Sequence, residues 1–264
     1  MNPSPQKLPV TVCMISGAEA HQIGRSLESV SSWAAEIIVV LNDDVADGTD
    51  QIAVAAGAKV FREAWKGHIA QKNSAAAKAT QPWILGLDSD EVVSPGLRAE
   101  IERTLSEPER ARQVAAYSFP RLTQYCGRWI RHGDWYPDRQ TRLWQRGHAV
   151  WGGIDPHDKL EVRGNVGRLR GDLLHFTAET MDRQIAKVTT FSNDFLRHVL
   201  TRKQRPGWWH LAFRPPWRFV RSYFLRLGFL DGWQGYHIAW MTAFATATRY
   251  AKVREAWSKI PPPR

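Results

Sequence analysis

The stretch WILGLDSDEVVSP, residues 83–95, joins an apolar run to a cluster of acids. Residues 84–87 suit a buried strand, and Asp88, Asp90 and Glu91 follow it directly. Carboxylates two apart in an extended segment can share a divalent cation, because Mg²⁺ and Mn²⁺ prefer oxygen ligands. Acids at the start of a helix would instead stabilise its dipole. A short D-x-D motif leaves both interpretations open, so the surrounding sequence has to decide between them.

The chain around this stretch alternates apolar strands with helices. Strands are predicted at 10–15, 36–41, 58–61 and 83–87, and helices at 23–30, 47–57 and 71–80. Near-continuous apolar strands between helices are typical of a parallel sheet covered on both faces. Such a sheet binds ligands at the carboxyl ends of its strands, which is where the acids lie. The pattern predicts an α/β fold of the nucleotide-binding kind.

The pattern changes twice in the second half of the chain. A helix is predicted at 94–107, and short strand-like segments between 114 and 176 predict a mixed or antiparallel extension of the sheet. A helical period returns at 177–203, and from residue 204 basic and aromatic residues alternate. We therefore predict one domain at 1–203 and a helical region at 204–264.

Composition limits the possible partners. The formal net charge is +10, and there are 13 tryptophans. A basic surface implies an anionic partner such as a nucleotide, a nucleic acid or membrane phosphates. The two cysteines, Cys13 and Cys126, lie in no ligand-spaced cluster, which argues against a zinc site and fits a reducing cytoplasm. No signal peptide or transmembrane helix is predicted.

A series of segments along residues 9–176 carries a family resemblance. In order they are VTVCMISGAEA, EIIVVLNDDVADGT, GAKVFREAWKGHIAQKNSAAAKA, WILGLDSDEVVSP, YCGRWIRHGDWYPDRQTRLWQR, and PHDKLEV with LLHF. Together they resemble the inverting family 2 glycosyltransferases, and more closely a subgroup of lipopolysaccharide-core transferases typified by a β-1,4-glucosyltransferase. The resemblance implies a GT-A fold, a Rossmann-like, mostly parallel sheet with a mixed extension. The donor half would span about 9–107 and the acceptor half about 108–176, with amphipathic helices after them.

The same resemblance implies a metal and a nucleotide-sugar donor. Asp88 and Asp90 would hold Mg²⁺ or Mn²⁺ and the donor diphosphate, with His175 as a further ligand or a phosphate contact. A lone histidine after apolar residues is equally a core group. The expected donor contacts are Ser16, Glu19, Asn42, Asp44, Gln71, Lys72, Asp88 and Ser89. A UDP-sugar is the default donor of the family. Asn42 stands where the family usually has aspartate, so the base stays open.

An inverting transfer needs a base for the acceptor hydroxyl. His157-Asp158 occupies the position of the family's His-Glu pair, which makes Asp158 the predicted base. Asp138 is the alternative base, although it equally suits a turn after proline.

Three further residues are expected on the acceptor side: Trp135, stacking on a sugar, with Tyr136 and Arg142. Arg139 and Arg142 could also hold phosphates of the donor or of the acceptor, or be charges on a strand surface.

The basic aromatic region favours a membrane surface. Amphipathic helices that mix arginine with tryptophan lie in the membrane interface. We therefore expect a cytoplasmic protein, peripheral on the inner face of the inner membrane, with a glycolipid or oligosaccharide acceptor. Packing of these aromatics on the first domain or on a second subunit is the alternative.

Two other function classes compete. A nucleic-acid-binding protein would use the charge and the aromatics but leaves the acid cluster unexplained. A nucleotidyltransferase should carry a glycine-rich, arginine-bearing loop after the first strand, and ISGAEAHQIGR is not one. We therefore predict a metal-assisted inverting glycosyltransferase of envelope polysaccharide or lipopolysaccharide synthesis, with no nucleic-acid partner.

Overall fold

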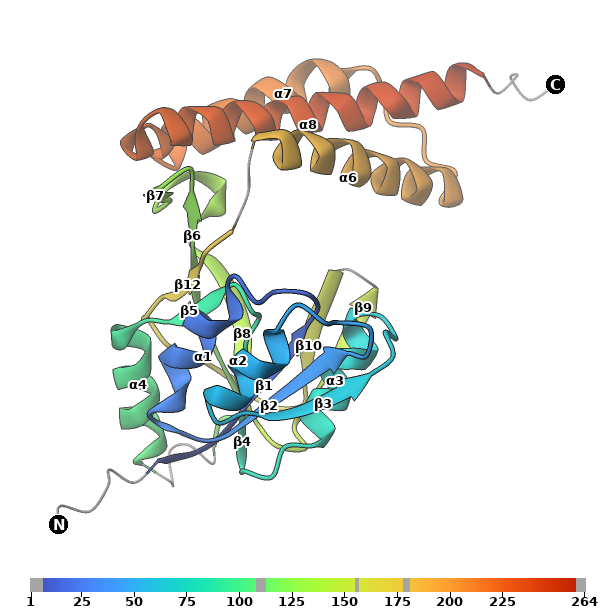
Figure 1. The fold of residues 1–264 in the computed structure, drawn as a ribbon. Helices are drawn as coiled ribbons and strands as arrows, with labels where there is room; N and C mark the ends of the chain where they lie inside the picture. Colours follow the sequence, from blue (N-terminus) through green and yellow to red (C-terminus); the bar gives the residue numbers. More distant parts are fainter. Residues whose placement is uncertain (1–6, 108–112, 155–156, 178–180, 260–264) are drawn as a thin grey trace, which may run out of the picture. The chain divides into compact units, whose positions relative to one another are not determined.

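The computed structural model describes residues 7–107, 113–154, 157–177 and 181–259 (Figure 1). The chain divides into two compact units. The first, called the sheet unit, comprises Met1–Arg121 and Asp138–Phe176. The second, called the helical unit, comprises Leu122–Pro137 and Thr177–Arg264. The segment at 177–203, which the sequence grouped with the first domain, therefore belongs to the helical unit.

The sheet unit is built on one large mixed sheet with the strand order β3-β2-β1-β4-β8-β6-β12-β5. The strands are β1 (Leu8–Ser16), β2 (Ala34–Asn42), β3 (Lys59–Glu63), β4 (Trp83–Gly86), β5 (Glu91–Val93), β6 (Ala116–Tyr125), β8 (Asp138–Gln145) and β12 (Leu173–His175). The pairs β1–β2, β2–β3 and β1–β4 are parallel, whereas β8 is antiparallel to both β4 and β6. The predicted parallel sheet with a mixed extension is confirmed.

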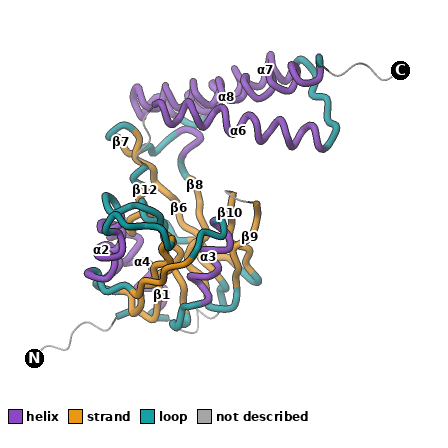
Figure 2. Tube along the Cα trace, turned by 45° about the vertical axis from the view of Figure 1, so that its right-hand side comes forward, coloured by secondary structure: helices purple, strands orange, loops and turns teal. Residues whose placement is uncertain are grey.

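Two smaller strands pair with β6, and two more form a separate pair. β7 (Arg128–Trp129), which belongs to the helical unit, and β11 (Val166–Arg168) pair with β6. β9 (Ala149–Ile154) and β10 (His157–Val162) form a separate antiparallel pair (Figure 2).

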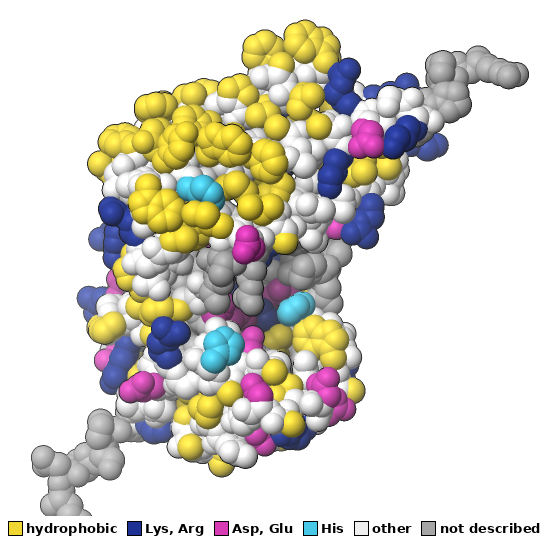
Figure 3. All heavy atoms as spheres, turned by 45° about the horizontal axis from the view of Figure 1, so that its top comes forward, with side chains coloured by type: hydrophobic (Ala, Val, Ile, Leu, Met, Phe, Trp, Pro, Cys, Tyr) yellow, Lys and Arg dark blue, Asp and Glu magenta, His cyan; other side chains and the backbone are white. Residues whose placement is uncertain are grey.

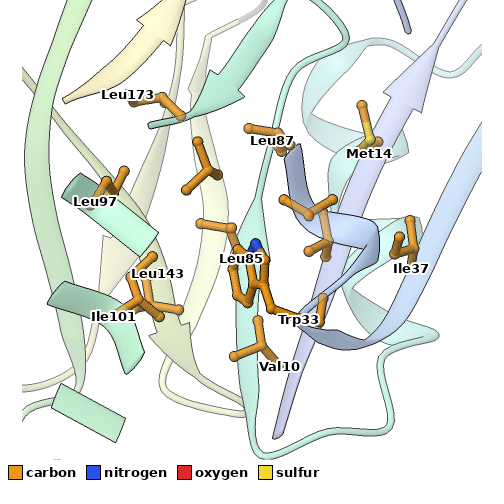
Figure 4. Close-up of a cluster of buried hydrophobic side chains, with 14 of the residues drawn as sticks. Val10, Met14, Trp33, Ile37, Leu85, Leu87, Leu97, Ile101, Leu143 and Leu173 are labelled. Atoms are coloured by element: carbon orange, nitrogen blue, oxygen red, sulfur yellow. The ribbon is translucent and has the colours of Figure 1, made fainter. Parts of the chain in front are cut away.

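Helices cover both faces of the parallel part. They are α1 (Ile23–Ser31), α2 (Thr49–Ala55), α3 (His68–Ala77) and α4 (Pro95–Leu105). Successive residues of β1 point to opposite faces, as the pleat of a strand requires. Val12 packs in the cluster that includes α1, α2 and α4, while Cys13 packs in the cluster that includes α3. Figure 4 shows part of the larger cluster.

The acidic stretch ends in a capped helix. Ser94 Oγ accepts a hydrogen bond from the Leu97 amide at 3.1 Å, and Pro95 occupies the first turn of α4. Both are favoured at a helix start. Because the cap begins at Ser94, the acids at 88–91 precede the helix and lie in a turn and a short strand.

The helical unit contains α6 (Met181–Thr201), α7 (Trp209–Val220) and α8 (Gly232–Ser258). α8 packs against both other helices, and Ile238 joins Tyr125 and Ile130 in a small core. A π-helical turn at Arg221–Leu225 and a 3₁₀ turn at Gly228–Asp231 connect α7 to α8. Among the helices described, none combines the length and the apolar character that crossing a bilayer requires.

Candidate active site

A cleft of about 460 Å³ lies at the carboxyl ends of β1, β2 and β4, where an open sheet of this kind binds ligands. It gathers most of the predicted site residues: Ser16, Glu19, Asn42, Lys72, Asp88, Ser89, Asp90, Asp158 and His175. They come from five strands or strand ends, one helix and the loop after β1. The structure therefore brings most of the predicted site residues together in one cleft.

The local fold fixes the end of β4. A Cβ on Gly86 would lie 2.9 Å from a ring carbon of Trp151, so the strand requires glycine there. Beyond it, the amide of Glu91 donates to the Asp88 carbonyl at 3.0 Å. The Asp88 amide in turn donates to the Glu91 carboxylate at 3.1 Å. Glu91 is fully buried, and it closes the turn that holds Asp88 and Asp90.

Two cations neutralise Asp88. Its Oδ1 lies 3.0 Å from Lys72 Nζ, and its Oδ2 accepts a hydrogen bond from Arg142 Nη2 at 2.7 Å. Burial alone would raise the pKa of Asp88, but Arg142 and Lys72 outweigh it and hold that pKa well below the usual range. Asp88 is therefore a permanent anion at neutral pH.

These contacts belong to a longer series of alternating charges, which we call the ion-pair chain. Its members in order are Asp158, Lys72, Asp88, Arg142, Glu91, Arg121 and Asp138. Lys72 Nζ lies 2.9 Å from Asp158 Oδ2. At the other end, Arg121 Nη2 lies 2.7 Å from Asp138 Oδ2. The two candidate bases thus stand at opposite ends of one network.

The ends of the ion-pair chain differ in their surroundings. Asp158 lines the cleft. Asp138 is not among the described residues that line it, and both of its carboxylate oxygens are engaged. Arg121 donates to Oδ2 at 3.0 and 2.7 Å, and Gln140 donates to Oδ1 at 2.8 Å. The geometry therefore favours Asp158 over Asp138 as the group that can reach a substrate.

Asp90 and His175 form a further polar pair in the cleft. β12 pairs with β5 in antiparallel register, with His175 opposite Glu91. This register brings His175 Nε2 to 3.1 Å from Asp90 Oδ2. The acid at position 90 thus has a histidine partner that lies 85 residues away in the sequence.

This pair could bind a divalent metal ion whose remaining ligands are oxygens of a diphosphate. Mg²⁺ is commonly held by one or two protein ligands together with substrate phosphates and water. Within the described residues, no group of three or more His, Cys, Asp or Glu side chains gathers around one point. Asp88 lines the same cleft as Asp90 and His175, and its carboxylate is held by two ion pairs.

Three hydroxyl and carboxyl groups of the cleft are in contact with one another. Glu19 Oε2 accepts hydrogen bonds from Ser16 Oγ, at 3.1 Å, and from Ser89 Oγ. Nearby at the end of β2, Asn42 Oδ1 is buried and accepts no hydrogen bond from the described residues. An acceptor of this kind suits the N–H edge of a base.

Two predicted donor contacts lie elsewhere. Asp44 is exposed and does not line the cleft. Gln71 is fully buried in α3, and neither polar atom of its amide has a partner in the described part of the chain. The cleft also contains Trp65 and His68, which the sequence analysis did not single out. Both are exposed and meet edge to face at 4.8 Å.

The predicted acceptor residues are dispersed. Trp135 and Tyr136 belong to the helical unit, where Trp135 packs edge to face on Tyr125 at 5.4 Å. Arg142 is 5% exposed and is held beneath Asp88, so it faces no open acceptor surface. Arg139 donates to the Ser118 and Leu169 carbonyls at 2.6 and 2.9 Å, which makes it a structural residue.

Comparisons with known proteins agree with this geometry. Residues 11–160 match the family model described as "Glycosyl transferase family 2". The "Lipopolysaccharide core biosynthesis glycosyltransferase LpsC" of Rhizobium meliloti is 28% identical over 259 residues, covering 93% of this chain and 94% of that protein. The "Uncharacterized glycosyltransferase RP128" of Rickettsia prowazekii is 26% identical and covers 93% of this chain and 87% of its own length.

Solved structures share the fold. The mannosyltransferase PcManGT from Pyrobaculum calidifontis, in complex with GDP-Man and Mn²⁺, aligns with a TM-score of 0.52 at 13% identity. The alignment covers 97% of this chain and 89% of that one. S. aureus TarS 1–349, in complex with UDP-GlcNAc, aligns with a TM-score of 0.50 at 14% identity, covering 95% and 91%. The predicted fold class is thereby confirmed.

Proposed function

The chain belongs to glycosyltransferase family 2, and from that membership we propose that it transfers a sugar, with inversion, from a nucleotide-diphosphate sugar to a glycan of the bacterial envelope. A UDP-sugar is the favoured donor. The observation that carries the proposal is a single cleft in which Asp90, His175 and Asp158 all open toward one space. The resemblance to a lipopolysaccharide-core enzyme supports a lipopolysaccharide-type acceptor.

Asp90 and His175 are the proposed metal-binding residues. A divalent ion bound there would supply positive charge that stabilises the departing diphosphate. Lys72 lies in α3 and lines the same cleft, so its ammonium group can pair with phosphate oxygens. When Lys72 turns from its carboxylate partners to a phosphate, Asp88 keeps its ion pair with Arg142.

Asp158 is the proposed base. Its carboxylate lines the cleft and is the kind of group that accepts a proton from a hydroxyl. It takes the proton of the acceptor hydroxyl while that oxygen attacks the anomeric carbon. The bond from the anomeric carbon to the diphosphate oxygen breaks on the opposite face, and the nucleoside diphosphate leaves.

The helical unit is the proposed contact with the membrane. α7 exposes Trp209, Phe213, Trp217 and Val220, and α8 exposes Trp233, Tyr236, Trp240 and Phe244. The spacing of three and four residues puts each set on one face of its helix. Figure 3 shows hydrophobic side chains gathered over these helices. Large apolar patches of this kind mark interaction sites.

The charge distribution supports the same assignment. The positive excess of the chain, +10 overall, lies in the helical unit, whereas the sheet unit is close to neutral. Basic and aromatic residues together suit the anionic interface of the inner leaflet. We therefore infer a peripheral position on the cytoplasmic face of the inner membrane, where a lipid-linked acceptor is accessible.

A panel of nucleotide-sugars tests the proposed chemistry. We expect the full chain to hydrolyse one UDP-sugar slowly in the presence of Mn²⁺, and the matching nucleoside diphosphate to raise its melting temperature. Single-stranded DNA serves as the control ligand and should give no shift. The proposal fails if DNA stabilises the protein and no nucleotide-sugar is bound or hydrolysed.

A further inference from the structure

A cluster of arginines belongs to the helical unit, and none of its members is among the residues that line the cleft. Arg214 and Arg218 lie one turn apart on α7, and Arg249 lies on α8. The guanidinium carbons of Arg214 and Arg249 lie 5.5 and 5.7 Å from the centre of the Tyr250 ring. We call Arg214, Arg218 and Arg249 the arginine cluster.

The partners of Arg214 and Arg249 are neutral. Arg214 Nη1 donates to Tyr250 Oη at 2.6 Å, and Arg249 Nη2 donates to Thr246 Oγ1 at 3.0 Å. In the described part of the chain, neither arginine forms an ion pair with a carboxylate.

Among the described residues, one carboxylate forms an ion pair with the arginine cluster. Asp134 Oδ2 lies 3.4 Å from Arg218 Nη2. Asp134 is shared, however, with Arg221 at 2.9 Å and Arg226 at 3.5 Å. One carboxylate therefore serves three guanidinium groups, and the cluster keeps an uncompensated positive charge.

The cluster also presents donors that nothing in the described chain uses. The Nε atoms of Arg218 and Arg249 are buried and have no hydrogen-bond partner there. Burial lowers the pKa of Arg249, Tyr250 raises it, and the like charges of Arg218 and Arg214 lower it further. Like charges and unpaired donors held together at a cost in stability are typical of a binding site.

We propose that the arginine cluster binds a phosphate group carried by a lipid headgroup. Guanidinium groups match phosphate oxygens in geometry and charge, and two can share one phosphate. Phe213 and Trp217, both exposed, flank Arg214 along α7, so apolar and phosphate-binding groups lie on neighbouring positions of one helix. The lipid source of the phosphate rests on the proposed membrane function, whereas phosphate binding itself does not.

The test uses the full chain and two single variants, Arg214→Gln and Arg249→Gln. Arg254→Gln is the matched control, because Arg254 is an exposed arginine of α8 outside the cluster. The first arm adds inorganic phosphate at constant ionic strength and follows the melting temperature. Phosphate should raise the melting temperature of the wild type and of Arg254→Gln, and should leave both cluster variants unmoved.

The second arm identifies the source of the phosphate. Vesicles of digalactosyldiacylglycerol, which contains no phosphate, are compared with the same vesicles containing phosphatidylglycerol. Phosphatidylglycerol should tighten wild-type binding about tenfold, and each cluster variant should lose most of that gain, since a charged hydrogen bond of this kind is lost. Arg254→Gln should keep the gain.

The outcomes distinguish the lipid source of the phosphate from the existence of the phosphate site. Stabilisation by inorganic phosphate without any effect of phosphatidylglycerol would overturn the lipid assignment. No response in either arm, or equal loss in Arg254→Gln, would overturn the site. Arg214 is exposed, so Arg214→Gln tests the proposal even if Arg249→Gln fails to fold. Neither arm contains a nucleotide-sugar or a metal, so failure of glycosyl transfer would not alter the result.

Discussion

At the scale of single residues, the three acids of the stretch at 88–91 differ in their surroundings. Asp88 is held by Lys72 and Arg142, and Asp90 meets His175. Glu91 closes the turn and lies 3.6 Å from Arg142. Among these acids, Asp90 alone is paired with a histidine, and a neutral imidazole is a common metal ligand.

The roles of the two candidate bases can be separated by substitution. Asp158→Asn should keep donor binding but lower the rate of transfer by about 10²-fold or more, because the general base is lost. Asp138→Asn is the matched control at the other end of the ion-pair chain and should retain transfer, measured with the donor found by the panel. Full activity of Asp158→Asn together with loss in Asp138→Asn would reverse the assignment.

The residues of the cleft differ in how far the sequence alone could place them. Asp88 was placed at a strand end from its sequence, whereas Ser16 and Asn42 were predicted from the family resemblance. The structure puts all three at strand ends that share one edge of the parallel sheet. Arg142 was not predictable in its role. It reaches Asp88 through the antiparallel pairing of β8 with β4, across 54 residues of sequence.

At the scale of elements, α7 and α8 each carry an aromatic stripe that the protein leaves exposed. Trp217 on α7 is 56% exposed and Trp240 on α8 is 50% exposed. The helical spacing of these residues was visible in the sequence. The grouping of α6 with them was not, because it depends on which face of α8 packs against which helix.

These stripes predict the response of membrane binding to substitution. Replacing Trp217 and Trp240 together by glutamine should weaken binding to phosphatidylglycerol vesicles at least about 100-fold, since burying one large apolar side chain contributes about 1.5–3 kcal/mol. Trp65→Gln is the control, because Trp65 is 49% exposed in the sheet unit. Vesicle binding by the double variant at the wild-type level would assign the stripes to another partner.

At the scale of the whole molecule, the chain divides its tasks and its charge between two units. The sheet unit holds the cleft and the ion-pair chain and is close to neutral. The helical unit holds the positive excess, the aromatic stripes and the arginine cluster. Overall composition indicated a basic, tryptophan-rich protein, but only the fold shows that these properties collect in one unit.

The central claim is that Asp90 and His175 hold a divalent ion which in turn holds the donor diphosphate. Calorimetric titration of UDP into the full chain, with Mn²⁺ and after its removal by EDTA, tests it directly. We expect binding that requires Mn²⁺ and that Asp90→Asn weakens at least about tenfold, while Asp182→Asn, an exposed residue of α6, leaves it unchanged. Equal, metal-independent binding of UDP by the wild type and Asp90→Asn would contradict the account.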